Sequence, residues 1–190
     1  MNDVHQHLDT ASHEALLVLA GSSIQCVLSA DCEMEAGSAL ITVQTLSIPI
    51  GSNGFCVIAN DWEDTPEEWI DYYVLSARIA TEPDRIHYTP NPGPGGAHYR
   101  ADHFSLALEA AARVGSIDIL MASENGAAES VTYDAGLLIS RADGLRIAIV
   151  RQQSIAGFLQ IAHTEADIAR VTADLEVRCS VVTQDVRTRR

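Results

Sequence analysis

The residues best suited to binding lie in one short stretch, ANDWEDTPEEWIDYY, at positions 59–73. It contains both tryptophans of the chain, Trp62 and Trp69, among six carboxylates. Aromatic side chains are frequent anchors of protein interfaces, and carboxylates around them favour a basic partner. Charge runs are also typical of solvated faces, and that interpretation competes with binding. The predicted partner-binding residues are Trp62, Asp61, Glu63, Asp64, Glu67 and Glu68.

The tetrapeptide TPEE at 65–68 has the pattern of a helix start. Threonine suits the cap, proline the first helical position, and the glutamates complement the helix dipole. A calcium-binding loop is excluded because Pro66 stands where the sharp-turn glycine is required. The alternating YYVLSARIA that follows suits a strand, so residues 66–80 fit either helix or strand. We expect Trp69 in the core and Trp62 exposed to the partner.

A second group of candidates lies in GGAHYRADHF, residues 95–104. Two imidazoles and a carboxylate after a flexible loop could form an acid–base site or bind one metal ion. The segment is similar to the H-x-H-x-D-H motif of the metallo-β-lactamase family, but Arg100 replaces the middle histidine, so we set the family aside. Aspartate here could equally cap a following helix. The weak catalytic candidates are therefore His98, Asp102 and His103.

Several chemistries are excluded by composition. All twelve basic residues are arginines, so no lysine is present for a Schiff base or a phosphate-binding loop. No G-x-S-x-G or G-x-G-x-x-G motif occurs, and no C-x-x-C pair suggests zinc. We predict no cofactor, no metal and four reduced thiols, at Cys26, Cys32, Cys56 and Cys179.

The charge balance limits the possible partners. The chain has 26 acidic and 12 basic residues, a net charge of −14. Nucleic acids and anionic membranes are bound by cations, so neither is expected as a partner. No apolar run approaches the ~18 residues of a membrane span, and the N-terminus does not resemble a signal peptide. With the unpaired cysteines, this predicts a cytoplasmic location.

The elements that must position these residues favour an α+β fold. At 190 residues, the chain fits a single domain over 1–190, with residues 1–10 and 184–190 as loosely held termini. Antiparallel patterns outnumber β-α-β alternation, which predicts a mainly antiparallel sheet of hairpins, meander-like, with two or three short helices. The alanine-rich segment 104–114 is a helix candidate that also fits a strand, and Thr164 caps another candidate helix. Residues 12–20 fit helix or strand.

Two hairpins are the most specific expectations. Between 131 and 151, a three-residue loop at 142–144 places Ile139 opposite Ile147 and Leu137 opposite Ile149, so apolar faces apolar. A second hairpin joins 45–50 to 55–59, with a bulge near 44–45.

Three functional hypotheses follow. The first is a small, acidic binding protein, inhibitor- or immunity-like, that presents the tryptophan and carboxylate surface to a basic partner. The alternatives are an enzyme of unidentified reaction, centred on His98, Asp102 and His103, and a structural subunit of a homo-oligomer. Of these, the sequence favours a binding protein over an enzyme.

Overall fold

The computed structural model describes residues 2–34, 36–51, 54–87, 89–93, 96–100 and 103–182, with only the backbone described for 89–93 and 96–100. In these residues the chain is mainly antiparallel β-sheet with two helices. The elements are β1 (Asn2–Gln6), α1 (Thr10–Ala20), β2 (Ser23–Ser29), β3 (Glu33–Met34), β4 (Ile41–Val43), β5 (Thr45–Ile50), β6 (Gly54–Asp64), β7 (Asp71–Ala80), β8 (Thr89–Gly93), β9 (Gly96–Arg100), β10 (Phe104–Asn125), β11 (Glu129–Arg141), β12 (Arg146–Arg151), β13 (Leu159–Ala162), α2 (Glu165–Val171) and β14 (Glu176–Val182).

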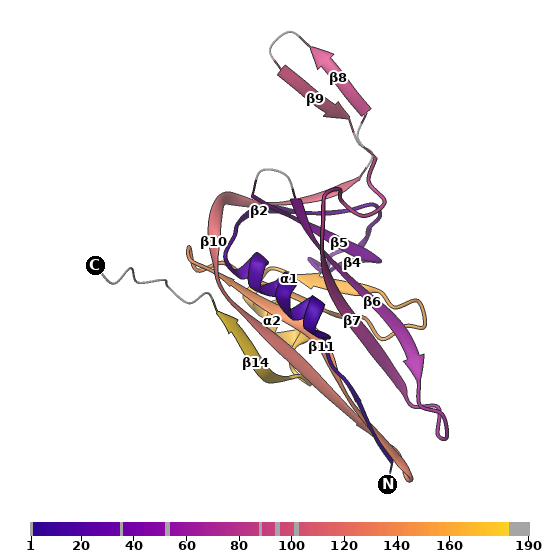
Figure 1. The fold of residues 1–190 in the computed structure, drawn as a ribbon. Helices are drawn as coiled ribbons and strands as arrows, with labels where there is room; N and C mark the ends of the chain where they lie inside the picture. Colours follow the sequence, from indigo (N-terminus) through magenta and orange to yellow (C-terminus); the bar gives the residue numbers. More distant parts are fainter. Residues whose placement is uncertain are drawn as a thin grey trace, which may run out of the picture.

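The long strand β10 organises the fold. Its second half pairs with β11 and its first half pairs with β2, giving the order β3-β4-β13-β12-β11-β10-β2-β5-β6-β7. Within the first half, the β2 pairing shifts register between Ala107 and Ala112, and Glu109 adopts a φ of 58°. Such a bulge bends a strand, so the β2-β5-β6-β7 part lies over the β10-β11 part (Figure 1). β14 pairs with β10, and β1 pairs with β11 in parallel.

Residues 104–114, which fit helix or strand by sequence, form part of strand β10 and not the candidate helix. Phe104, Leu106 and Leu108 alternate along β10 and pack against the core, while the backbone pairs with β2. Alanine favours a helix by only a fraction of a kcal/mol per residue, and strand pairing with apolar burial outweighs that preference.

The hairpin predicted between 131 and 151 is confirmed. Ile139 pairs with Ile147 and Leu137 with Ile149, and all four side chains are buried. Gly144 has a φ of 90°, the left-handed conformation that this loop requires. The predicted hairpin of β5 and β6 is also present. Near the predicted bulge at 44–45, the chain leaves β4, which pairs with β13, and enters β5, which pairs with β2.

The two helices pack against different strands, α1 against β7 and β10 and α2 against β12 and β13. The ambiguous segment 12–20 is helical, and α1 packs Leu16 and Leu19 into the main core. The hydroxyl of Ser12 accepts a 3.1 Å hydrogen bond from the backbone N–H of Ala77, which covers the free edge of β7. α2 is confirmed, and its cap Thr164 accepts a hydrogen bond from the N–H of Asp167. Neither helix of the described chain is long and apolar enough to span a bilayer.

The N-terminal residues differ from expectation. Residues 1–10 were predicted to be a loosely held lead-in, but Asn2–Gln6 pair with Glu129–Tyr133 of β11. The side of β11 left open beyond the β12 pairing accepts this strand, because an unpaired edge offers backbone groups to any extended segment. The predicted loose C-terminus, 184–190, lies outside the described residues.

Candidate functional site

The acidic stretch forms the end of the β6–β7 hairpin. Thr65 N–H donates to the carbonyl of Ile70 at 3.0 Å, and the Thr65 hydroxyl accepts the N–H of Ile70 at 3.1 Å. The threonine therefore closes a turn and does not cap a helix, so the predicted helix start at 65–68 is wrong. β6 and β7 are paired up to Asp64 and Asp71, and the chain must reverse within the six residues between them.

The two tryptophans point in the reverse of the predicted directions. Trp69 lies in the turn with a φ of 58° and is 73% exposed. Trp62 is half-buried, packs in the cluster of Tyr72, Tyr73 and Tyr133, and has its indole nitrogen shielded from solvent. Alternation along β6 explains this, since Trp62 follows the buried Ile58 at an even spacing and shares its inward face.

Two of the predicted binding carboxylates, those of Glu63 and Glu68, accept hydrogen bonds from other groups of the protein. The Glu68 carboxylate accepts backbone N–H groups from Ala127, Ala128 and Glu129 at 3.1, 2.9 and 2.8 Å. These hydrogen bonds hold the pKa of Glu68 below its ordinary value. Glu63 accepts the Tyr72 hydroxyl at 2.6 Å. Glu68 therefore has a structural role, and its assignment to the binding surface stays a prediction.

The remaining predicted acids stay near the surface. Asp61 and Glu67 are exposed, and Asp64 is half-buried at the end of β6. We call residues 61–69 the acidic tip. Its exposed aromatic group is Trp69, a residue that the sequence placed in the core.

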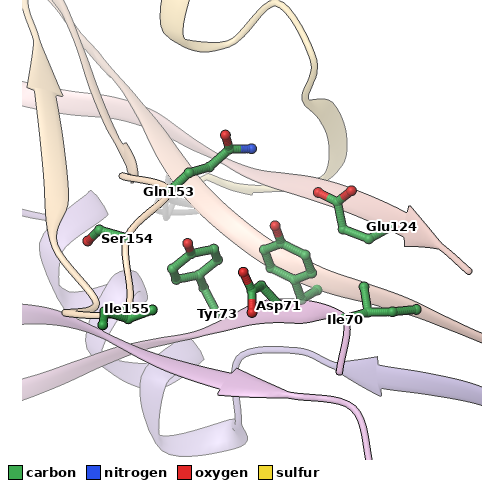
Figure 2. A pocket seen from close by; sticks show the side chains of 8 residues that line it. Ile70, Asp71, Tyr73, Glu124, Gln153, Ser154 and Ile155 are labelled. Carbon is green, nitrogen blue, oxygen red and sulfur yellow. The ribbon is translucent and has the colours of Figure 1, made fainter. Parts of the chain in front are cut away.

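A cavity of about 440 Å³ opens beside the acidic tip (Figure 2). β7, β10, β11 and the loop after β12 contribute its walls. We call it the tyrosine pocket; its lining residues are Ile70, Asp71, Tyr73, Glu124, Tyr133, Gln153, Ser154 and Ile155. Sequence reasoning missed this site, although tyrosines at inward positions of two strands were a visible signal.

A buried arginine fixes the two tyrosines. Arg151 donates from Nε to the Tyr133 hydroxyl oxygen at 2.5 Å, and its guanidinium carbon lies 5.5 Å from the Tyr133 ring centre and 6.0 Å from that of Tyr73. Nη2 lies 3.3 Å from a carboxylate oxygen of Asp174 and 3.6 Å from one of Glu124. Arg151 thus shows that these ring faces and carboxylates can hold a guanidinium group.

Both phenols of the pocket stay protonated. Burial raises the pKa of Tyr133 to about 12 and also raises the pKa of Tyr73. Neither hydroxyl therefore supplies a phenolate base near neutral pH.

The predicted catalytic residues are only partly described. His98 belongs to β9 of the β8–β9 hairpin, Asp102 lies outside the described residues, and His103 is half-buried just before β10. The hairpin stands at the end of the molecule opposite the acidic tip (Figure 1). No group of three or more His, Cys, Asp or Glu suited to a metal ion occurs in the described part. All four cysteines have free thiols.

The chain was compared with protein-family models, curated proteins and solved structures. None of these comparisons found a match.

Proposed function

We propose that this chain is a binding protein that engages a basic partner through the acidic tip. The observation that carries the proposal is Trp69, a large aromatic side chain that is 73% exposed at the end of a hairpin. An indole on the surface gains free energy when a partner removes it from water, and tryptophan is enriched among the residues that dominate interfaces.

The turn that presents Trp69 is ordered before binding. The buried Glu129 accepts the backbone N–H groups of Glu67 and Glu68 at 3.1 and 2.9 Å, and the N–H of Trp69 donates to the Thr65 carbonyl. A preorganised turn loses less conformational entropy on association than a flexible loop. The backbone around Trp69 therefore favours binding.

The charge of the chain supports a basic partner. The net charge of −14 attracts cations over distances comparable to the Debye length, about 8 Å at physiological ionic strength. Attraction of this kind raises association rates and falls with added salt. Free thiols fit a reducing compartment, so we place the protein in the cytoplasm as part of this proposal.

Immobilised protein and a native extract test the proposal. We expect a basic protein to be retained at about 0.05 M salt and released at about 0.5 M. Trp69→Ala should abolish retention. Ile79→Ala removes a 47% exposed side chain near the other end of β7, and it should leave retention unchanged. Retention that is equal in the Trp69→Ala variant would exclude the acidic tip as the binding site.

A further inference from the structure

We propose that the tyrosine pocket receives the guanidinium group of an arginine side chain from the basic partner. This inference rests on the proposed function and names the chemistry that the partner must present. Its starting point is the cavity of about 440 Å³, which lies within the usual range of ligand pockets, roughly 300–1,000 Å³.

The lining of the tyrosine pocket is acidic without a compensating base. It contains Asp71 and Glu124 but no arginine or histidine. The cavities of about 400 and 510 Å³ elsewhere in the described chain are each lined by two arginines, whereas the smaller cavities of about 230 and 330 Å³ also have acidic residues without a base. Arg151 is not part of this lining, and its Nη2 lies 3.6 Å from a carboxylate oxygen of Glu124 and 3.3 Å from one of Asp174, so one positive charge is shared between two acids. An entering cation therefore meets an excess of negative charge.

Asp71 supplies the carboxylate that is available to a ligand. The side chain of Asp71 has no hydrogen bond or ion pair with any residue that the structure describes, whereas the Glu124 carboxylate lies 3.6 Å from Arg151. Figure 2 shows the Asp71 carboxylate beside the Tyr73 ring, among the lining side chains. A guanidinium group there could pair with the carboxylate and lie near an aromatic ring.

The strand register adds an independent observation. Asp71 lies directly opposite Asp64 in the last pair of the β6–β7 ladder. Like charges at directly opposed positions destabilise a sheet, so the pair costs stability in the free protein. A bound cation would relieve this repulsion, which favours a ligand of positive charge.

The rim of the pocket suits the rest of an arginine side chain. Ile70 and Ile155 line it, and Ile155 is 78% exposed. Arginine has three methylene groups that can pack along an apolar surface while the guanidinium group stays in a polar environment. Ile70 is also the neighbour of Trp69 in the chain, so a partner bound at the acidic tip could extend an arginine into the tyrosine pocket.

The test uses N-acetyl-arginine amide as the probe and N-acetyl-citrulline amide as its uncharged isostere, in NMR titrations of the intact chain. We expect the arginine probe to shift the NMR signals of backbone amides 70–73 and 153–155, with a Kd on the order of 1 mM. The citrulline probe should bind at least about tenfold more weakly.

Variants of the chain test the role of the carboxylate. Asp71→Asn should weaken the binding of the arginine probe about tenfold. Glu82→Gln removes the same charge from an exposed position beyond the other end of β7, outside both the pocket and the acidic tip, and should have little effect.

Equal binding of the two probes, or binding that is indifferent to Asp71→Asn, would overturn the inference. The outcome is separable from that of the proposed function. If extract binding requires Trp69 while neither probe binds, the pocket inference fails and the proposed function stands. If the arginine probe binds but no basic protein is retained, the proposed function fails.

Discussion

Glu68 and Glu129 exchange hydrogen bonds with each other's backbone. The Glu68 carboxylate accepts the N–H groups of Ala127, Ala128 and Glu129, and Glu129 Oε2 accepts those of Glu67 and Glu68. The two carboxylates join the turn of the β6–β7 hairpin to the turn between β10 and β11. They fix the acidic tip against the other layer of the fold.

Gly126→Ala should disrupt this carboxylate exchange. A Cβ at Gly126 would lie 2.2 Å from Glu68 Oε2 and 2.9 Å from Ile70 Cδ1. Both groups are held in place, so we expect overpacking to lower the free energy of unfolding by about 1–2 kcal/mol. Urea denaturation measures the change. Gly54→Ala is the control, because its Cβ would make ordinary contacts at 3.6 Å, and an equal loss in both variants would contradict the prediction.

The free energy of unfolding should decrease as the pH is lowered, because the same two carboxylates become protonated. Hydrogen bonds to the charged forms, from the backbone for Glu68 and chiefly from the Thr65 side chain for Glu129, lower both pKa values from 4.5. A lowered folded-state pKa gives stability that is present above about pH 4.5 and is lost as the pH falls through the folded value. We expect the free energy of unfolding, measured by urea denaturation between pH 7 and about pH 3, to decrease less in the Glu68→Gln variant than in the wild type. Parallel curves would show that other acids cause the loss.

The exposure of Trp69 predicts its fluorescence. In the Trp62→Phe variant, emission comes from Trp69 alone, which is 73% exposed, and should be shifted to the red. The surrounding carboxylates attract cations, so caesium should quench this emission more strongly than iodide at equal concentration. Trp69→Phe leaves the half-buried Trp62, whose emission should be bluer and less quenched. Blue, protected emission from Trp69 would contradict the position of the side chain.

Asp71→Asn should stabilise the free protein. It removes one of two carboxylates that lie directly opposite each other across β6 and β7, and we expect a gain of about 0.5 kcal/mol. Asp64→Asn should give a similar gain, and both gains should shrink at high salt. Thermal unfolding at two salt concentrations provides the measurement. A loss of stability in Asp71→Asn would mean that the carboxylate has a structural role.

Arg151→Lys should destabilise the fold although lysine carries the same positive charge as arginine. An ammonium group cannot reproduce the contacts of the buried guanidinium with Tyr133, Asp174 and Glu124, and we expect a loss of about 2 kcal/mol. Arg146→Lys changes an exposed arginine that pairs with Glu165, so it should have little effect on denaturation. Similar results for the two variants would refute the role assigned to Arg151.

The sequence by itself determined those elements whose signals are local. The β11–β12 hairpin could be predicted to the exact pair, Ile139 with Ile147, because a period of two, a loop of fixed length and a left-handed glycine all agree. The cap at Thr164 likewise identified α2, because capping involves residues three apart. Such signals need no knowledge of the rest of the chain.

Tertiary structure decided the elements whose local signals were ambiguous or misleading. Residues 104–114 have helical composition but pair with β2, and TPEE at 65–68 has a helix-start pattern but lies in a hairpin turn. For 104–114, pairing with the distant strand β2 exceeds a local preference of a fraction of a kcal/mol per residue. For 65–68, the pairing of β6 with β7 and the hydrogen bonds from Glu67 and Glu68 to the distant Glu129 carboxylate exceed it. The exposed position of Trp69 follows from that turn.

The tyrosine pocket also depended on the tertiary structure. Tyr73, Tyr133 and Arg151 are separated by 60 and 18 positions, and Glu129 reaches across 61 positions to the backbone of Glu68. No periodicity or motif connects residues at these separations, since their contact depends on how β10 bends and brings β7 over β11. The sequence determined the charge and the residue types that a binding site here can use; the packing of the two layers decided which of them meet.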